Sequence, residues 1–149
     1  MKHIILFLIF SFLLSCDCED LLPTTPDNIP DPFQVQEDFG LGPDGNLFFS
    51  SFPLNKFVND SSVVKNKSVL VEGSDSIISI DIQNNVFSST LFISGTINGC
   101  GPNTFPCNGT ITVTLKGTGD DVIKSIDGQV LDGDRNNVDG GDFVETFTF

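Results

Sequence analysis

Short stretches rich in Val, Ile, Thr and Phe alternate with clusters of Gly, Asn, Asp and Pro from about residue 46 onward. The clearest alternation lies at 110–115, where Thr fills every second position and Ile, Val and Leu fill the others. This period indicates strands with one buried and one solvated face, and no stretch shows the helical period of about 3.6 residues. The pattern predicts strands at 46–52, 76–82, 89–97, 109–116, 121–126 and 143–149.

About six or seven short strands in about 100 residues favour one all-β domain at 46–149, folded as a β-sandwich. The preceding segment, 16–45, has a different composition, because five of the eight prolines lie there among Asp, Thr, Asn and Gly. Such a composition is typical of an extended, semi-rigid chain. We therefore expect an acidic, proline-rich tether at 16–45 before the folded domain.

The N-terminus carries a short basic start, Lys2 and His3, and then an apolar run at 4–14. A transmembrane helix needs about 20 apolar residues, so we interpret 1–15 as a signal peptide that is removed. The run ends in Leu13-Leu14-Ser15-Cys16, which resembles the lipobox of bacterial lipoproteins. The resemblance implies that Cys16 is the first mature residue and carries acyl chains, each held by roughly 0.8 kcal/mol per buried methylene. An ordinary secretory signal with a nearby cleavage site is the alternative.

Acidic residues surround Cys18 directly after the predicted anchor, in Asp17-Cys18-Glu19-Asp20. In lipoproteins of the Bacteroidota such a cluster resembles the signal for surface display, whereas in enterobacteria an Asp at this position implies inner-membrane retention. A solvated start of the tether is the third interpretation. We expect an outer-membrane lipoprotein of the bacterial cell envelope, exposed at the surface.

Charge and composition narrow the function classes. Without 1–15 the chain has 20 acidic and six basic residues, a formal charge of −14. This charge repels phosphates, so it excludes nucleic acid as a partner, disfavours anionic lipid headgroups and favours cations. The 15 Phe come with neither Trp nor Tyr, which weakens the case for a sugar-binding module. The single histidine, His3, leaves with the signal peptide, so no Ser-His-Asp triad can form and we do not expect an enzyme.

Four cysteines are present, at 16, 18, 100 and 107. With Cys16 acylated, Cys100 and Cys107 are the natural disulfide pair, because they bracket a turn-rich loop in a chain bound for an oxidising compartment. Closing that eight-residue loop stabilises the fold by about 2.5 kcal/mol. Cys18 is left over, to stay free, to pair between molecules, or to pair with Cys16 if that residue is not acylated.

The last forty residues carry a second resemblance. The run GTITVTLKGT at 109–118, the Asp127-Gly128 turn, the Asp/Gly/Asn-rich loop at 131–142 and the Phe/Thr strand at 143–149 are similar to the end of a bacterial immunoglobulin-like domain of the S-layer SbsA type. The resemblance implies an immunoglobulin-like antiparallel β-sandwich of about seven strands. It also implies a structural or spacer module without catalysis.

The strongest candidate site is an acidic loop with oxygen ligands at alternate positions. Its predicted ligands are Asp132, Asp134, Asn136, Val138 through its backbone carbonyl, Asp139 and Asp142. Calcium takes six to eight such oxygens, so we expect a structural calcium ion here. The loop is not an EF-hand, because Asn137 replaces the required Gly and Phe143 the required Glu. An Asp/Asn/Gly turn with its charges in water is the alternative.

These observations predict a lipid-anchored envelope protein with a non-catalytic immunoglobulin-like structural or interaction module. It reaches the membrane through its anchor, and its protein or glycan partner is unknown. A surface adhesin that presents its loops is the first alternative, with Phe105 as the first suspected contact. A soluble secreted glycoprotein is the second, because Asn59, Asn66 and Asn108 fit the N-glycosylation pattern.

Overall fold

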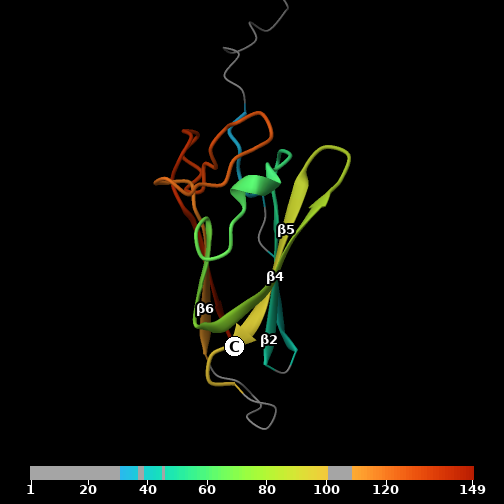
Figure 1. Ribbon diagram of the computed structural model, residues 1–149, viewed down its shortest axis with the longest axis vertical. Helices are drawn as coiled ribbons and strands as arrows, with labels where there is room; N and C mark the ends of the chain where they lie inside the picture. The colour runs from blue at the N-terminus through green and yellow to red at the C-terminus, as the bar shows by residue number, and fades with distance from the viewer. Residues whose placement is uncertain (1–30, 37–38, 45, 101–108) are drawn as a thin grey trace, which may run out of the picture. The chain divides into compact units, whose positions relative to one another are not determined.

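A computed structural model describes residues 31–36, 39–44, 46–100 and 109–149 (Figure 1). The described residues form seven strands and, between the second and third strands, a 3-10 turn, η2, at Asp60–Ser62. The strands are β1 (Phe39–Asp44), β2 (Leu47–Pro53), β3 (Val69–Glu72), β4 (Ser74–Asn84), β5 (Ser89–Ile97), β6 (Thr110–Leu115) and β7 (Phe143–Thr148). The all-β prediction is confirmed.

The strands form two antiparallel sheets, one of four strands in the order β1-β2-β5-β4 and one of three in the order β3-β6-β7. With the strands lettered A to G along the chain, these orders are A-B-E-D and C-F-G. They are the two sheets of a constant-type immunoglobulin domain. The predicted immunoglobulin-like sandwich of about seven strands is therefore confirmed.

The core lies between the sheets, because alternate positions of each strand face inward. In β5 every odd position is buried, including Leu91 and Ile93, and in β6 Ile111 and Val113 are buried while the threonines between them face outward. The rings of Phe52 on β2 and Phe143 on β7 meet edge to face, with their centroids 5.6 Å apart. Such a pair is worth about 0.5–1.5 kcal/mol beyond its buried area. It joins the two sheets.

One residue, Gly73, carries the chain from β3 in one sheet to β4 in the other. Its φ is +80°, a conformation that L side chains rarely adopt. A Cβ here would lie 2.1 Å from the backbone oxygen of Thr110. The crossover therefore requires glycine.

The folded unit begins earlier than predicted. Residues from Asp31 onward belong to one compact unit, and Phe33 and Val35 are fully buried in its core. Phe33 bridges to Leu131 and Val35 to Leu54. The predicted domain start at residue 46 is therefore wrong, because two apolar side chains on one side of a short extended segment are enough to fix it to the core. The predicted signal peptide and the rest of the tether lie outside the described residues.

One predicted strand is wrong, and two observed strands have no predicted counterpart. Residues 121–126 form no strand and make only single bridges, Val58 with Ser125 and Lys124 with Val130. The reason is that this part belongs to a connection, 116–142, that folds back over the core and buries Val122, Ile123 and Leu131. The strands β1 and β3 were not predicted. β3 is only four residues long, too short for its alternation to stand out.

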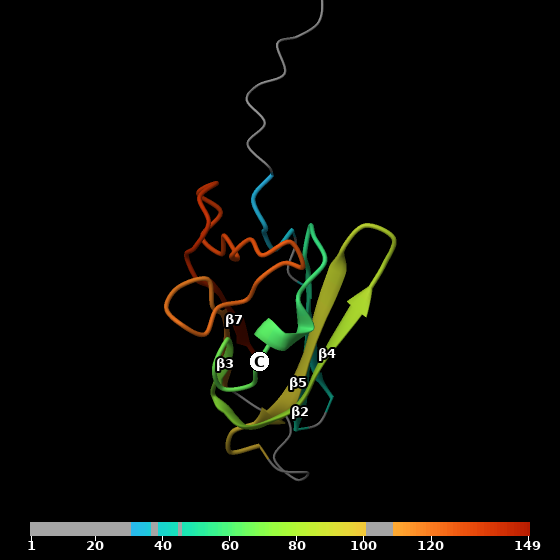
Figure 2. The same ribbon diagram turned by 45° about the horizontal axis from the view of Figure 1, so that its top comes forward.

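Three connections and the start of the described chain gather at one end of the sandwich, which we call the loop end. They are the B–C connection at 54–68, the D–E turn at 85–88 and the F–G connection at 116–142, and the first described segment, 31–36, lies with them (Figures 1 and 2). The C-terminus and the β1–β2 turn lie at the opposite end. Among the described residues, no helix has the length and apolar character to cross a membrane.

Candidate functional site: the loop end

The F–G connection is ordered by backbone hydrogen bonds within itself and to the N-terminal segment. The Ile123 amide donates to the Lys116 carbonyl (2.8 Å) and the Leu131 amide to that of Ile123 (3.0 Å), so the connection is folded on itself. The Asp132 amide donates to the Phe33 carbonyl (2.8 Å), which ties it to the N-terminal segment. The predicted ligand loop therefore starts from a fixed point.

Asp132, the first predicted calcium ligand, is fully buried. Its carboxylate accepts hydrogen bonds from Gln34 Nε2 (2.5 Å) and from the backbone amides of Asn136 (3.1 Å) and Asn137 (2.9 Å). Burial alone would raise the pKa of this carboxyl, but the hydrogen bonds from Gln34 and Asn137 outweigh it, and the pKa lies below its usual value. Asp132 thus holds the loop to the N-terminal segment.

Asp142, the last predicted ligand, has an equivalent role at the other end of the loop. Its Oδ1 accepts from the backbone amides of Gly117 (3.0 Å) and Thr118 (2.9 Å) and from the Thr118 hydroxyl (2.7 Å). These donors lie just after β6, whereas Asp142 lies just before β7. The carboxylate therefore closes the base of the F–G connection.

Three of the remaining predicted ligands are joined by hydrogen bonds through Asn136. Its side-chain Nδ2 donates to the Asp134 carboxylate (3.0 Å), and its Oδ1 accepts from the Val138 backbone amide (2.8 Å). Asp134 and Asp139 are exposed. The described residues hold no cluster of three or more His, Cys, Asp or Glu side chains arranged for a metal. The six-ligand calcium site stays a prediction.

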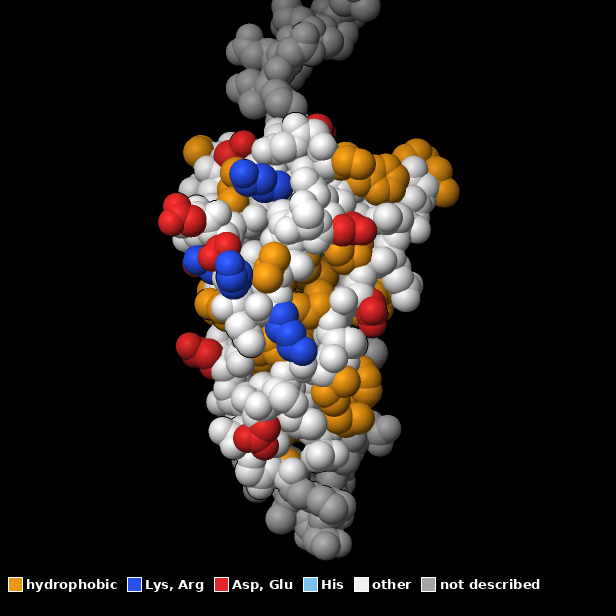
Figure 3. Space-filling model, in the orientation of Figure 1, with side chains coloured by type: hydrophobic (Ala, Val, Ile, Leu, Met, Phe, Trp, Pro, Cys, Tyr) orange, Lys and Arg blue, Asp and Glu red, His pale blue; other side chains and the backbone are white. Residues whose placement is uncertain are grey.

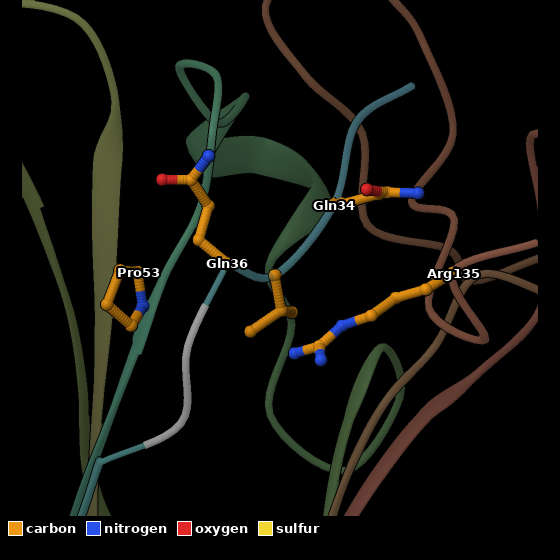
Figure 4. Close-up of a pocket in the computed structure, with 5 residues that line it drawn as sticks. Gln34, Gln36, Pro53 and Arg135 are labelled. Atoms are coloured by element: carbon orange, nitrogen blue, oxygen red, sulfur yellow. The ribbon is translucent and has the colours of Figure 1, made fainter. Parts of the chain in front are cut away.

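A cavity of about 550 Å³ opens beside the same loop (Figure 4). Its described lining includes Gln34 and Gln36 of the N-terminal segment on one side and Arg135 of the F–G connection on the other. Arg135 extends toward the N-terminal segment, whereas the Gln34 and Gln36 side chains point away from its guanidinium. Val35 and Pro53 complete this lining. The Arg135 guanidinium lies 5.6 Å from the ring centroid of Phe143, which helps to hold it in place.

The D–E turn is the feature that sequence reasoning missed. Val86 and Phe87 at its tip are 79% and 82% exposed. Asn85 Oδ1 accepts from the backbone amides of Phe87 (2.9 Å) and Ser88 (2.9 Å), and the Asn85 amide donates to the Ser88 carbonyl (2.9 Å). The signal was present in the sequence, because two large apolar residues stand inside an Asn/Ser turn cluster, NNVFSS.

The cysteine predictions fall partly outside the described residues. Cys100 packs against the core and is disulfide-bonded. Its predicted partner Cys107 lies outside the described residues, so the pairing itself stays a prediction. The same holds for Cys16, Cys18 and Phe105.

Comparisons of this chain with protein families, with characterised proteins and with solved structures found no match. The functional argument therefore depends on the residues and the geometry alone.

Proposed function

We propose that the chain is a lipid-anchored protein of the bacterial cell envelope whose immunoglobulin-like domain is a non-catalytic interaction module. The observation that carries this proposal is Cys16, placed directly after an apolar run too short to span a membrane. A β-sandwich with ordered loops at one end supports it, because such domains commonly bind partners through their loops.

Two features favour an interaction module over a purely structural spacer. Phe87 is exposed at the tip of a hydrogen-bonded turn, and a cavity lined in part by Gln36 and Arg135 opens beside the F–G connection. A spacer needs neither feature. A protein that holds two large apolar side chains in water carries a cost in solubility, which a binding role would explain.

The intact mass of the protein purified from its native host tests the proposal. We expect a mass that starts at Cys16, includes two or three acyl chains, and rises by two hydrogens for each disulfide on reduction. A Cys16→Ser variant, as the matched control, should keep its signal peptide or be cleaved elsewhere and lack acyl chains. A lipid-free mass for the wild type, above all one with hexose increments, would instead favour the soluble glycoprotein.

A further inference from the structure

The most exposed large hydrophobic side chains are concentrated at the loop end. The four most exposed among the described residues are Phe87 (82%), Val86 (79%), Ile126 (73%) and Val138 (64%). The first two lie on the D–E turn and the other two on the F–G connection. Figure 3 shows a hydrophobic group at the upper right, where Figure 1 places the D–E turn. Val86 and Phe87 are neighbours on one turn, so they form a local exposed apolar patch of the kind that marks an interaction site.

The turn that carries Val86 and Phe87 has a fixed shape. Four hydrogen bonds link Asn85 and Ser88 across it. Asn85 N donates to Ser88 O, Ser88 N to Asn85 Oδ1 and Asn85 Nδ2 to Ser88 Oγ, each at 2.9 Å, and Ser88 Oγ donates to Asn85 Oδ1 at 3.2 Å. The turn continues the β4–β5 ladder, in which Asn84 pairs with Ser89. Because the backbone is held, contact with a partner costs little conformational entropy.

The same end of the domain receives the chain from its N-terminus. The segment that begins the described chain lies at the loop end in both views (Figures 1 and 2), and its Phe33 bridges to Leu131 of the F–G connection. Only 15 residue steps separate Asp31 from Cys16, so the two can be at most about 50 Å apart. An anchor at Cys16 therefore keeps the loop end close to the bilayer at a high effective concentration.

We propose that the loop end is a second membrane contact, in which Val86 and Phe87 enter the interface of the bilayer that holds the acyl chains. This inference depends on the proposed lipid anchor. The lipid surface is a neutral one, because the F–G connection carries seven Asp against two Lys and one Arg. Those carboxylates repel anionic headgroups, so the contact is apolar rather than electrostatic.

A single-tryptophan experiment tests the contact directly, since the chain contains neither Trp nor Tyr. The mature, acylated Phe87→Trp variant is reconstituted into phosphatidylcholine vesicles whose acyl chains carry bromine, a quencher of tryptophan fluorescence. The matched control is Ile78→Trp, an exposed apolar position (53%) on β4. It lies six strand residues, roughly 20 Å, from Asn84, where the turn begins. Both sites are exposed, so neither variant should disturb the core.

We expect strong quenching and a shift of emission to shorter wavelength at position 87, and neither at position 78. Replacing half of the lipid with phosphatidylglycerol should weaken the quenching at low salt. In phosphatidylcholine vesicles, the acylated protein that carries both Phe87→Trp and Val86→Ser should be quenched less than the acylated Phe87→Trp variant.

Each contrary outcome has a distinct meaning. An acylated protein without quenching at position 87 overturns this inference and leaves the lipid anchor standing. Equal quenching at positions 78 and 87 overturns it too, because the domain would then lie on its side. Stronger quenching with phosphatidylglycerol overturns the inference that the contacted lipid surface is neutral. A mature protein without acyl chains overturns both the anchor and the contact.

Discussion

The sheets and the F–G connection bury apolar side chains by different means. In β5 and β6 the backbone is paired in a ladder, and alternate side chains reach the core without help from polar groups. The F–G connection buries Ile123 and Leu131 with only single bridges beside it. There, carboxylates accept hydrogen bonds from backbone amides that no ladder pairs. Polar side chains therefore matter most where the ladder ends.

Phe33→Ala should have the largest effect on stability, because it removes a fully buried ring from the segment that joins the F–G connection to the core. We expect the free energy of unfolding to fall by about 3–5 kcal/mol, measured by urea denaturation. The exposed Asp31→Ala serves as the control and should change it little. A loss below about 1 kcal/mol for Phe33→Ala would restore the tether interpretation of this segment.

Asp132→Asn should have the next largest effect on stability. The amide group that replaces one carboxylate oxygen brings N–H donors to a site already facing the donors of Gln34, Asn136 and Asn137. We expect a loss of about 2–3 kcal/mol by chemical denaturation. Asp139→Asn, at an exposed position, is the control and should be nearly neutral. Equal effects of the two variants would contradict a special role for Asp132.

The same carboxyl predicts a pH dependence. Because its pKa in the folded state lies below the ordinary value of 3.8, its contribution to stability is fully present above 3.8 and is lost as the pH falls through the folded value. The difference in unfolding free energy between wild type and Asp132→Asn should be constant at neutral pH and shrink below pH 3.8. A difference that grows on acidification would show that the pKa is raised instead.

Two buried serines, one in a connection and one in a sheet, test the same comparison with smaller expected effects on stability. Ser68 in the B–C connection accepts from the Val64 amide (2.7 Å) and donates to the Ser62 carbonyl (2.6 Å), whereas the buried hydroxyl of Ser50 on β2 has no partner among the described residues. Ser68→Ala should cost about 1–2 kcal/mol, and Ser50→Ala should stabilise the domain by about 1 kcal/mol. Thermal unfolding of both variants measures the contrast. The same sign for both would contradict it.

Calcium should have the smallest effect, because Asp132 and Asp142 already accept hydrogen bonds from the chain. For a dissociation constant of about 1 mM, at the weak end for extracellular modules, 1 mM calcium adds about 0.4 kcal/mol. Calorimetry with and without calcium measures the gain, and Asp134→Asn should reduce it. A larger gain would mean that the loop rearranges around the ion.

The sheets were more predictable from sequence than the loop end. β5 was predicted with its observed limits, 89–97, because nine residues alternate between core and solvent. Phe33 and Val35 were missed because two apolar residues among Pro, Asp and Gln give too short a pattern to recognise. The candidate site was located by its Asp spacing, but which donors its carboxylates meet depends on Gln34 and Gly117. Those residues are 98 and 25 positions away from Asp132 and Asp142 in the sequence.

The one-residue crossover at Gly73 bears on the order in which the domain folds. Once the four-residue turn has paired β4 with β5, β3 is already held near the sheet by a single link, so it can meet β6 at little extra cost in loop entropy. β7 is different, because among the described strands it pairs with β6 alone, and the 27 residues of the F–G connection must close first. β7 should therefore join last, which makes the pairing of the final strand the slow step of folding.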